Sequence, residues 1–190
     1  MQIDQEVSKN LRRIRKEKGL TLDKTAELTG VSKAMLSQIE RGVSSPTIAR
    51  LWQIATGLNV SFSQFVIASQ VISTQPDILK ISNDQSVDDW VNDDFFVNVL
   101  FPYEVSLGFE VYELGLKESY EHKSEAHNLG VIEHVICVSG RMAINCDDAW
   151  HVLGEGQAIR FSGAQPHSYK NIGNGRALFH NIIHYPPTDY

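Results

Sequence analysis

The side chains best suited to a recognisable chemistry lie between Gly30 and Gly42, in the segment GVSKAMLSQIERG. Helical spacing places Leu36 and Ile39 on one face of this segment, and small, amide and cationic side chains on the other faces. A short helix with such an exposed edge fits the major groove of DNA, where amides and cations hydrogen-bond to base edges. The segment therefore predicts nucleic acid as a partner.

Capping residues and glycines predict five short helices around this segment. The helices are expected over residues 7–18, 22–29, 33–41, 47–56 and 62–68. Thr21, Ser32 and Ser61 supply hydroxyl groups for the open N–H groups at helix starts. Gly42 and Gly57 are expected to follow helix ends, because glycine adopts the left-handed conformation that closes a helix.

Residues 11–65 resemble the XRE, or phage-repressor-like, class of helix-turn-helix domains. The matching stretches are LRRIRKEKGLTLDKTAELTGVSKAMLSQIERG and SSPTIARLWQIATGLNV. The resemblance implies a five-helix, lambda-repressor-like domain whose third helix, residues 33–41, enters the major groove. Arg15 and Glu40 match positions that pair inside such domains, so we expect them to be structural.

The resemblance also assigns the residues that read DNA. Those nearest to the bases are Ser32, Lys33, Ala34, Ser37 and Gln38. Gln38 can pair with adenine, and Lys33 can reach guanine acceptors or a phosphate. Phosphate contacts are expected from Arg41 and Ser45. The alternative is a protein-docking surface, which the short, polar edge without large aromatic side chains disfavours.

Charge is unevenly distributed along the chain. Residues 1–70 contain ten Lys and Arg against six Asp and Glu, whereas residues 71–190 contain seven against seventeen. Attraction to phosphates acts over about 8–10 Å at moderate salt, so the basic first part matters more than the overall charge of −6. We expect a DNA-binding domain over residues 1–69, a linker over 70–94 and a second domain over 95–190.

Cysteine content and hydropathy indicate the compartment. Cys137 and Cys146 are the only cysteines and do not form a CxxC motif, so a disulfide framework is not expected. No apolar run approaches the roughly 20 residues that span a bilayer. The sequence therefore predicts a reduced, cytoplasmic protein with no membrane partner.

From Phe95 onward, short strand patterns alternate with turn residues. The expected strands are FFVNVLF, LGFEVYEL, VIEHVICV, RMAINC, QAIRF and ALFHNIIHY. Many short strands predict a sandwich or small barrel, so the chain as a whole belongs to the multi-domain α plus β class.

This second part resembles a cupin, the double-stranded β-helix barrel, through two motifs. Glu133 and Gly140 keep the spacing of the first motif, and His127 lies where its first histidine belongs, but Leu129 replaces the second. The second motif is kept at Gly156, His167 and Asn171, with Ser162 and Ala164 at its Pro and Gly positions. The departures leave the fold well supported and the metal site incomplete.

The cupin resemblance implies that His127, Glu133 and His167 converge in the barrel mouth. Two imidazoles and a carboxylate suit a divalent first-row metal, zinc first among them, with an open position for water or ligand. His122 is a candidate fourth ligand. The alternative is a polar pocket without metal, in which these side chains hydrogen-bond a small molecule.

Further residues are candidates for the wall of a ligand pocket. They are Cys137, His180, His184, Tyr112 and Phe161. Cys137 shares a strand face with Glu133, and His180 and His184 share a face of the last strand. Core packing is the alternative interpretation for each of these residues.

Together the two resemblances imply a homodimeric transcriptional regulator with a cupin sensor for a small-molecule effector. Stretches such as GVSKAML, GVIEHV and NIIHYP are most similar to regulators of sulfur utilisation, which implies a sulfur-containing or amino-acid-like effector. One competing class is a cupin metalloenzyme fused to a DNA-binding module. It lacks the second motif histidine and an obvious catalytic partner. A third class, an antitoxin-like binder of another protein, fits an inward His and Glu less well.

Overall fold

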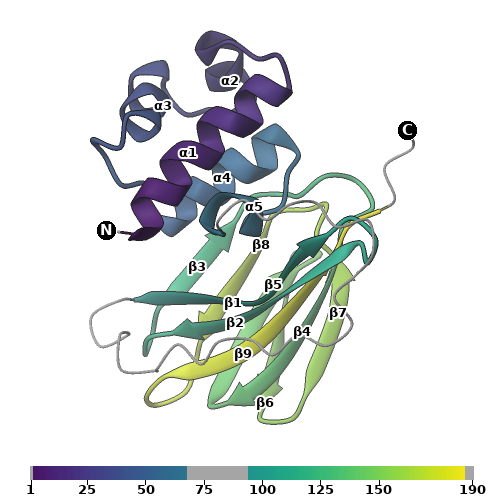
Figure 1. Ribbon diagram of the computed structural model, residues 1–190. Helices are drawn as coiled ribbons and strands as arrows, with labels where there is room; N and C mark the ends of the chain where they lie inside the picture. Colours follow the sequence, from purple (N-terminus) through teal and green to yellow (C-terminus); the bar gives the residue numbers. More distant parts are fainter. Residues whose placement is uncertain (1, 68–93, 187–190) are drawn as a thin grey trace. The chain divides into compact units, whose positions relative to one another are not determined.

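The computed structural model describes residues 2–67 and 94–186, which belong to two compact units, Met1–Ser73 and Thr74–Tyr190. We call them the helical unit and the strand unit (Figure 1). The predicted linker, residues 70–94, lies outside the described residues except for Asp94. No helix among the described residues is long and apolar enough to cross a membrane.

Residues 2–67, the part of the helical unit that the structure describes, form five helices, as the sequence predicted. They are α1 (Gln2–Glu17), α2 (Leu22–Thr29), α3 (Lys33–Glu40), α4 (Ile48–Leu58) and α5 (Ser63–Val66). Thr21 and Ser32 cap α2 and α3 by accepting hydrogen bonds from the N–H groups of Lys24 and Met35. Fully buried Leu11, Leu36 and Ile54 form the centre of its core.

Two local predictions are wrong. Gly57 lies inside α4, which ends at Leu58 and is followed by Asn59 as its left-handed C-cap. A Cβ atom on Gly57 would lie 2.6 Å from the carbonyl oxygen of Leu28, so the close approach of α2 explains this glycine. Ser61 does not cap the fifth helix, because α5 is a single turn that begins at Ser63 and has no side-chain cap.

The described residues of the strand unit, 94–186, form nine strands in two sheets that face each other (Figure 1). The strands are β1 (Phe95–Glu104), β2 (Phe109–Leu116), β3 (Glu121–Ser124), β4 (Ile132–Ser139), β5 (Arg141–Cys146), β6 (Ala149–Gly154), β7 (Ala158–Ser162), β8 (His167–Asn171) and β9 (Ala177–His184). One sheet has the order β1-β2-β9-β4-β7 and the other β3-β8-β5-β6. All their pairings are antiparallel.

Alternation along the strands separates the two faces of each sheet. On β9, Phe179, Asn181 and Ile183 are buried, while the residues between them are less buried or exposed. On β8, His167, Tyr169 and Asn171 are the buried set. Polar side chains therefore point into the space between the sheets, where a buried polar group needs a partner.

Candidate functional site

Helix α3 presents the polar edge that the sequence predicted. Leu36 and Ile39 are buried in the core of the helical unit, which fixes the rotation of α3 about its axis. Lys33, Ala34 and Gln38 are exposed on the remaining surface. Of the other candidates for DNA contact, Ser32, Arg41 and Ser45 are exposed and Ser37 is half-buried.

Several of these side chains have partners within the helical unit. The hydroxyl of Ser32 caps α3, so this group is engaged in holding the helix. The Lys33 ammonium lies 2.9 Å from a carboxylate oxygen of Asp23, and Arg41 donates a hydrogen bond of 2.8 Å to Ser37. Each pair is exposed, so it contributes little to the stability of the fold. Breaking it to contact DNA would therefore cost little free energy.

Arg15 and Glu40 form the internal pair that the resemblance implied. The Nε and Nη2 atoms of Arg15 donate to the two Glu40 oxygens at 2.6 and 2.9 Å, and Nη1 donates to the carbonyl oxygen of Leu20. The hydrogen bond with Glu40 raises the pKa of Arg15. This two-bond geometry holds α1 against the end of α3.

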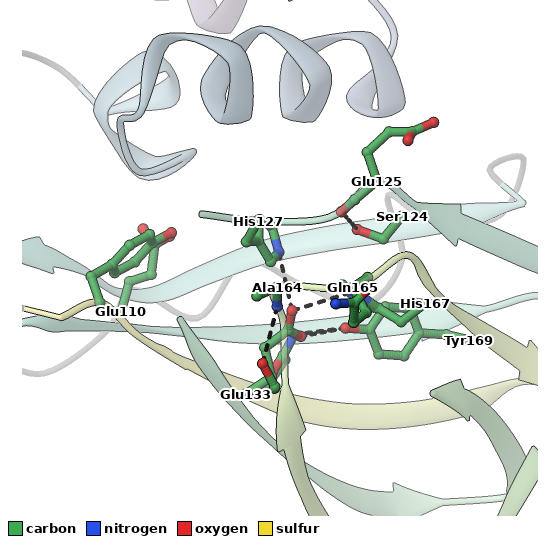
Figure 2. A network of polar contacts seen from close by, with 12 residues as sticks. Glu110, Ser124, Glu125, His127, Glu133, Ala164, Gln165, His167 and Tyr169 are labelled. Carbon is green, nitrogen blue, oxygen red and sulfur yellow. Dashed lines mark hydrogen bonds and ion pairs between the residues drawn. The ribbon is translucent and has the colours of Figure 1, made fainter. Parts of the chain in front are cut away.

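Glu133 is the centre of the polar group in the strand unit (Figure 2). It lies on β4, is fully buried, and faces the four-stranded sheet. Its Oε1 atom lies 3.0 Å from Nε2 of His127 and 3.1 Å from Nε2 of His167. The three side chains place one ligand atom each within 4.8 Å of one another.

Different elements bring the two histidines to Glu133. His167 is the first residue of β8. His127 precedes β4, and its backbone N–H donates a hydrogen bond of 2.8 Å to the carbonyl oxygen of Gly163. A Cβ atom on Gly163 would lie 3.0 Å from both Oε1 of Glu133 and the His127 ring, so the site needs a residue without a side chain there.

The second oxygen of Glu133 is held by two neutral donors. The Tyr169 hydroxyl and the Nδ2 atom of Asn181 both donate to Oε2, the latter at 2.8 Å. These bonds orient the carboxylate so that Oε1 faces the histidines. Burial raises the pKa of Tyr169, and Glu133 raises it further, so this hydroxyl remains a donor.

The charges in this group support one another. Burial alone would raise the pKa of Glu133, but contacts with His127 and His167 hold it well below its usual value. Burial lowers the pKa of His167, and the contacts with Glu133 more than offset this and raise it. The carboxylate is therefore ionised and favours a cation beside Oε1.

The hydrogen bond at the far side of the His167 ring indicates which cation suits the site. Nδ1 of His167 lies 2.9 Å from the carbonyl oxygen of Gln165, so Nδ1 is the donor there. In a neutral ring Nε2 then carries a lone pair that faces the lone pairs of Oε1, and neither atom has a hydrogen bond by geometry. A metal ion or a proton between them removes the repulsion. A hydrogen bond from Nδ1 to a carbonyl oxygen, which orients the ring, is typical of a histidine that binds a metal through Nε2.

The structure does not bring all the predicted residues to this group. His122 lies on β3 and stacks on Phe95 with ring centroids 4.0 Å apart, outside the three-residue group. Burial, together with the nearby His167, lowers the pKa of His122 to about 4. His122 is therefore a buried, neutral ring that packs against an aromatic side chain.

The predicted pocket residues divide between the two faces of the five-stranded sheet. Phe161 contacts the His167 ring edge-on at 5.3 Å, and buried Tyr112 and Cys137 face inward. His180 and His184 lie on the opposite, outer face of β9, because Asn181 and Ile183 take the inward positions. The prediction that these two histidines line a pocket with Glu133 is therefore wrong.

Three inward polar residues escaped the sequence prediction as site residues. Tyr169 was not among the candidate residues, although its hydroxyl donates to Glu133. Asn181 and Glu110 are polar residues on strands whose other buried positions are apolar. That pattern could have identified them from the sequence, because a buried polar side chain requires a hydrogen-bond partner.

Comparison with known proteins defines the class. Residues 11–65 match the helix-turn-helix family model HTH_3, and residues 114–183 match the cupin domain model Cupin_2. The chain is 41% identical over 180 residues, 95% of each chain, to the HTH-type transcriptional regulator SutR of Escherichia coli K12. The chain therefore belongs to the XRE-type helix-turn-helix transcriptional regulators with a C-terminal cupin domain.

Two further relatives are consistent with this assignment. A crystal structure of an HTH_3 family transcriptional regulator from Vibrio cholerae is 42% identical and superposes with a TM-score of 0.79 over 97% of each chain. The HTH-type transcriptional regulator PuuR of Escherichia coli K12 is 24% identical over 173 residues, 88% of each chain. The protein is thus a DNA-binding transcriptional regulator with a cupin domain.

Proposed function

We propose that the protein is a sequence-specific regulator whose strand unit binds a small-molecule effector at a metal centre formed by His127, Glu133 and His167. The observation that carries this proposal is the convergence of two imidazole nitrogens on one oxygen of a buried carboxylate. Zinc suits two nitrogen ligands and one oxygen ligand, with a remaining position for water or for the effector. The metal supplies Lewis-acid binding of an effector atom when it is present.

DNA reading is assigned to α3. Lys33, Ala34, Ser37 and Gln38 would contact base edges, with Ser32 beside them at the N-terminus of the helix, and Arg41 and Ser45 would contact phosphates. The exposed polar edge of α3 and the buried Leu36 and Ile39 support this orientation. Two copies of the chain would present two such helices to half-sites one DNA turn, about 34–36 Å, apart.

Effector binding regulates DNA affinity in this scheme. A ligand shifts a conformational equilibrium only if it binds the two states with different affinity. The effector must therefore bind the DNA-competent and DNA-incompetent forms unequally. A substrate turned over by the same site would instead place the protein among cupin metalloenzymes.

The proposed metal centre is tested by measuring the zinc content and zinc affinity of the protein. We expect the full chain to bind one zinc ion per protomer, and His127→Ala and His167→Ala each to lose it. His151→Ala is the matched control, because His151 is an exposed histidine on β6. Wild-type zinc content in both site variants would contradict the assignment.

The proposed DNA-reading role of α3 is tested with an operator selected from randomised DNA duplexes. Gln38→Ala should relax the preference at one base pair by about 1–3 kcal/mol. Lys33→Ala should weaken binding, whereas Lys123→Ala, which removes an exposed charge from the strand unit, should not. Unchanged affinity and base preference in both α3 variants would refute the orientation of α3. Mass measurement by light scattering, with and without operator, tests the homodimer.

A further inference from the structure

An ion pair joins the first turn of α2 to the first residue of α3. The Lys33 ammonium lies 2.9 Å from Oδ2 of Asp23, which is ten residues earlier in the chain. Asp23 is the acidic residue in the first turn of α2, and Lys33 is the only Lys or Arg among the residues of α3. The side chains of Asp23 and Lys33 are 71% and 57% exposed, so a DNA duplex can reach both of them.

Asp23 places a negative charge near the expected path of the DNA backbone. In helix-turn-helix domains, the helix before the recognition helix crosses the phosphate backbone. The N-terminus of a helix attracts anions through its open N–H groups and its dipole, so it suits a phosphate. In α2 the first turn instead carries the Asp23 carboxylate, and the Thr21 hydroxyl accepts the hydrogen bond of the Lys24 N–H group. Asp23 therefore repels a phosphate where α2 would otherwise bind one.

Lys33 without its partner would have little preference among DNA atoms. A lysine is a point charge on a flexible stem, and contacts between such a charge and phosphates carry no sequence information. The pair with Asp23 offsets the charge that attracts phosphates, and it uses one of the three N–H donors of the ammonium. Guanine presents two acceptors, O6 and N7, in the major groove. These two acceptors match the two donors that remain.

We propose that Asp23 determines specificity by restraining Lys33, so that the Lys33 ammonium reads guanine in the major groove and does not bind phosphates. The inference rests on the proposed function of α3 as the DNA-reading helix. Asp23 acts through Lys33 and is therefore a positioning residue. It lowers the affinity for DNA of any sequence and enlarges the difference between the operator and other sequences.

The test compares three duplexes bound by the full chain: the selected operator, the operator with one guanine replaced by adenine, and a scrambled duplex. The guanine to replace is the one whose preference is lost in Lys33→Ala. Asp23→Ala should reduce the preference for this guanine by about 2- to 5-fold, the size of an exposed ion pair. It should also bind the scrambled duplex more tightly, with a log–log salt slope steeper by about 0.9, the value for one added phosphate contact.

Glu27→Ala is the matched control. Glu27 is another exposed carboxylate of α2, and its partner at 2.8 Å is Lys24 of the same helix. The control removes the same charge but leaves the pair between Asp23 and Lys33 intact, so the preference for guanine should stay at the wild-type value. A wild-type preference in Asp23→Ala, or an equal loss of preference in Glu27→Ala, overturns the proposal. It is also overturned if no guanine preference depends on Lys33.

A double-mutant cycle separates this inference from the proposed function. In the Lys33→Ala background, Asp23→Ala should leave the base preference unchanged, because the side chain that it restrains is gone. A further change in preference there would show that Asp23 acts without Lys33, which overturns the proposal. Unchanged binding in both Lys33→Ala and Gln38→Ala contradicts the assignment of α3 itself. A guanine preference that is lost in Lys33→Ala but kept in Asp23→Ala contradicts only the positioning role of Asp23.

Discussion

The two oxygens of Glu133 have different neighbours, and this difference organises the site. Oε1 faces His127 and His167, whereas Oε2 accepts hydrogen bonds from Tyr169 and Asn181. A carboxylate bonded on one side only would be free to rotate. Bonds to both oxygens hold the ligand atom in place before any metal binds, which reduces the ordering cost of binding.

Removing the Tyr169 hydroxyl tests this arrangement. Tyr169→Phe should weaken zinc affinity by about 10- to 100-fold, the usual effect of losing a bond that orients a ligand. The measurement is competition against a chromophoric zinc chelator. Tyr120→Phe is the control, because Tyr120 packs near Phe95 and is not among the residues bonded to Glu133. Equal zinc affinity in wild type and Tyr169→Phe would contradict a positioning role.

His122 gives a prediction for pH. Its pKa in the folded state is about 4, below the ordinary value of 6.5, so the unfolded chain binds a proton first as pH falls. The folded state is therefore destabilised below pH 6.5, by about 2 kcal/mol at pH 5 relative to pH 7.5. His122→Phe should lose this part of the acid sensitivity. Urea unfolding of the metal-free full chain at both pH values measures the free energy of unfolding. Equal acid sensitivity of wild type and His122→Phe would contradict the prediction.

At the scale of elements, the sequence predicted most of the helical unit because its signals are local. The capping hydroxyls of Thr21 and Ser32 and the left-handed glycines Gly30 and Gly42 act within a few residues of their position. Gly57 was misread because its reason is tertiary. Nothing near it in sequence reveals that the backbone of α2 lies against it.

Gly57→Ala tests whether packing outweighs helix propensity. Alanine in a helix is favoured over glycine by about 1 kcal/mol. The clash with the carbonyl of Leu28 should reverse the sign and destabilise the helical unit by about 1–3 kcal/mol. Thr56→Ala, at the preceding position of α4, is the control, because it raises helix propensity and removes atoms instead of adding them. The measurement is the Tm of each variant. A raised Tm in Gly57→Ala would show that α2 moves enough to accommodate the added Cβ atom.

In the strand unit, the longer apolar strands were predicted and three shorter strands were missed. β3, β6 and β8 have the sequences EHKS, AWHVLG and HSYKN, which carry little alternation of apolar residues. The site prediction singled out His127, Glu133 and His167 by motif spacing, and the structure brings these three side chains together. It failed for His180 and His184, because the inward face of β9 is set by pairing with β4 and not by residue type.

At the scale of the whole molecule, a metal ion at Glu133 would act as a ligand of the folded state. Free zinc at 100 times its Kd should stabilise the strand unit by about 2.7 kcal/mol. Calorimetry of the full chain with zinc and with excess chelator measures this as a shift in Tm. His167→Ala should show no shift, and a shift of wild-type size in that variant would place the stabilising ion elsewhere.

The position of Glu133 between the sheets has a consequence for local motion. Glu133 belongs to the five-stranded sheet, whereas His167 and Tyr169 belong to β8 of the four-stranded sheet. An ion held by both would join the two sheets, so opening either would require releasing it. Amide hydrogen exchange should then slow together in β4 and β8 when zinc is added, and independent exchange in the two strands would show that they open separately.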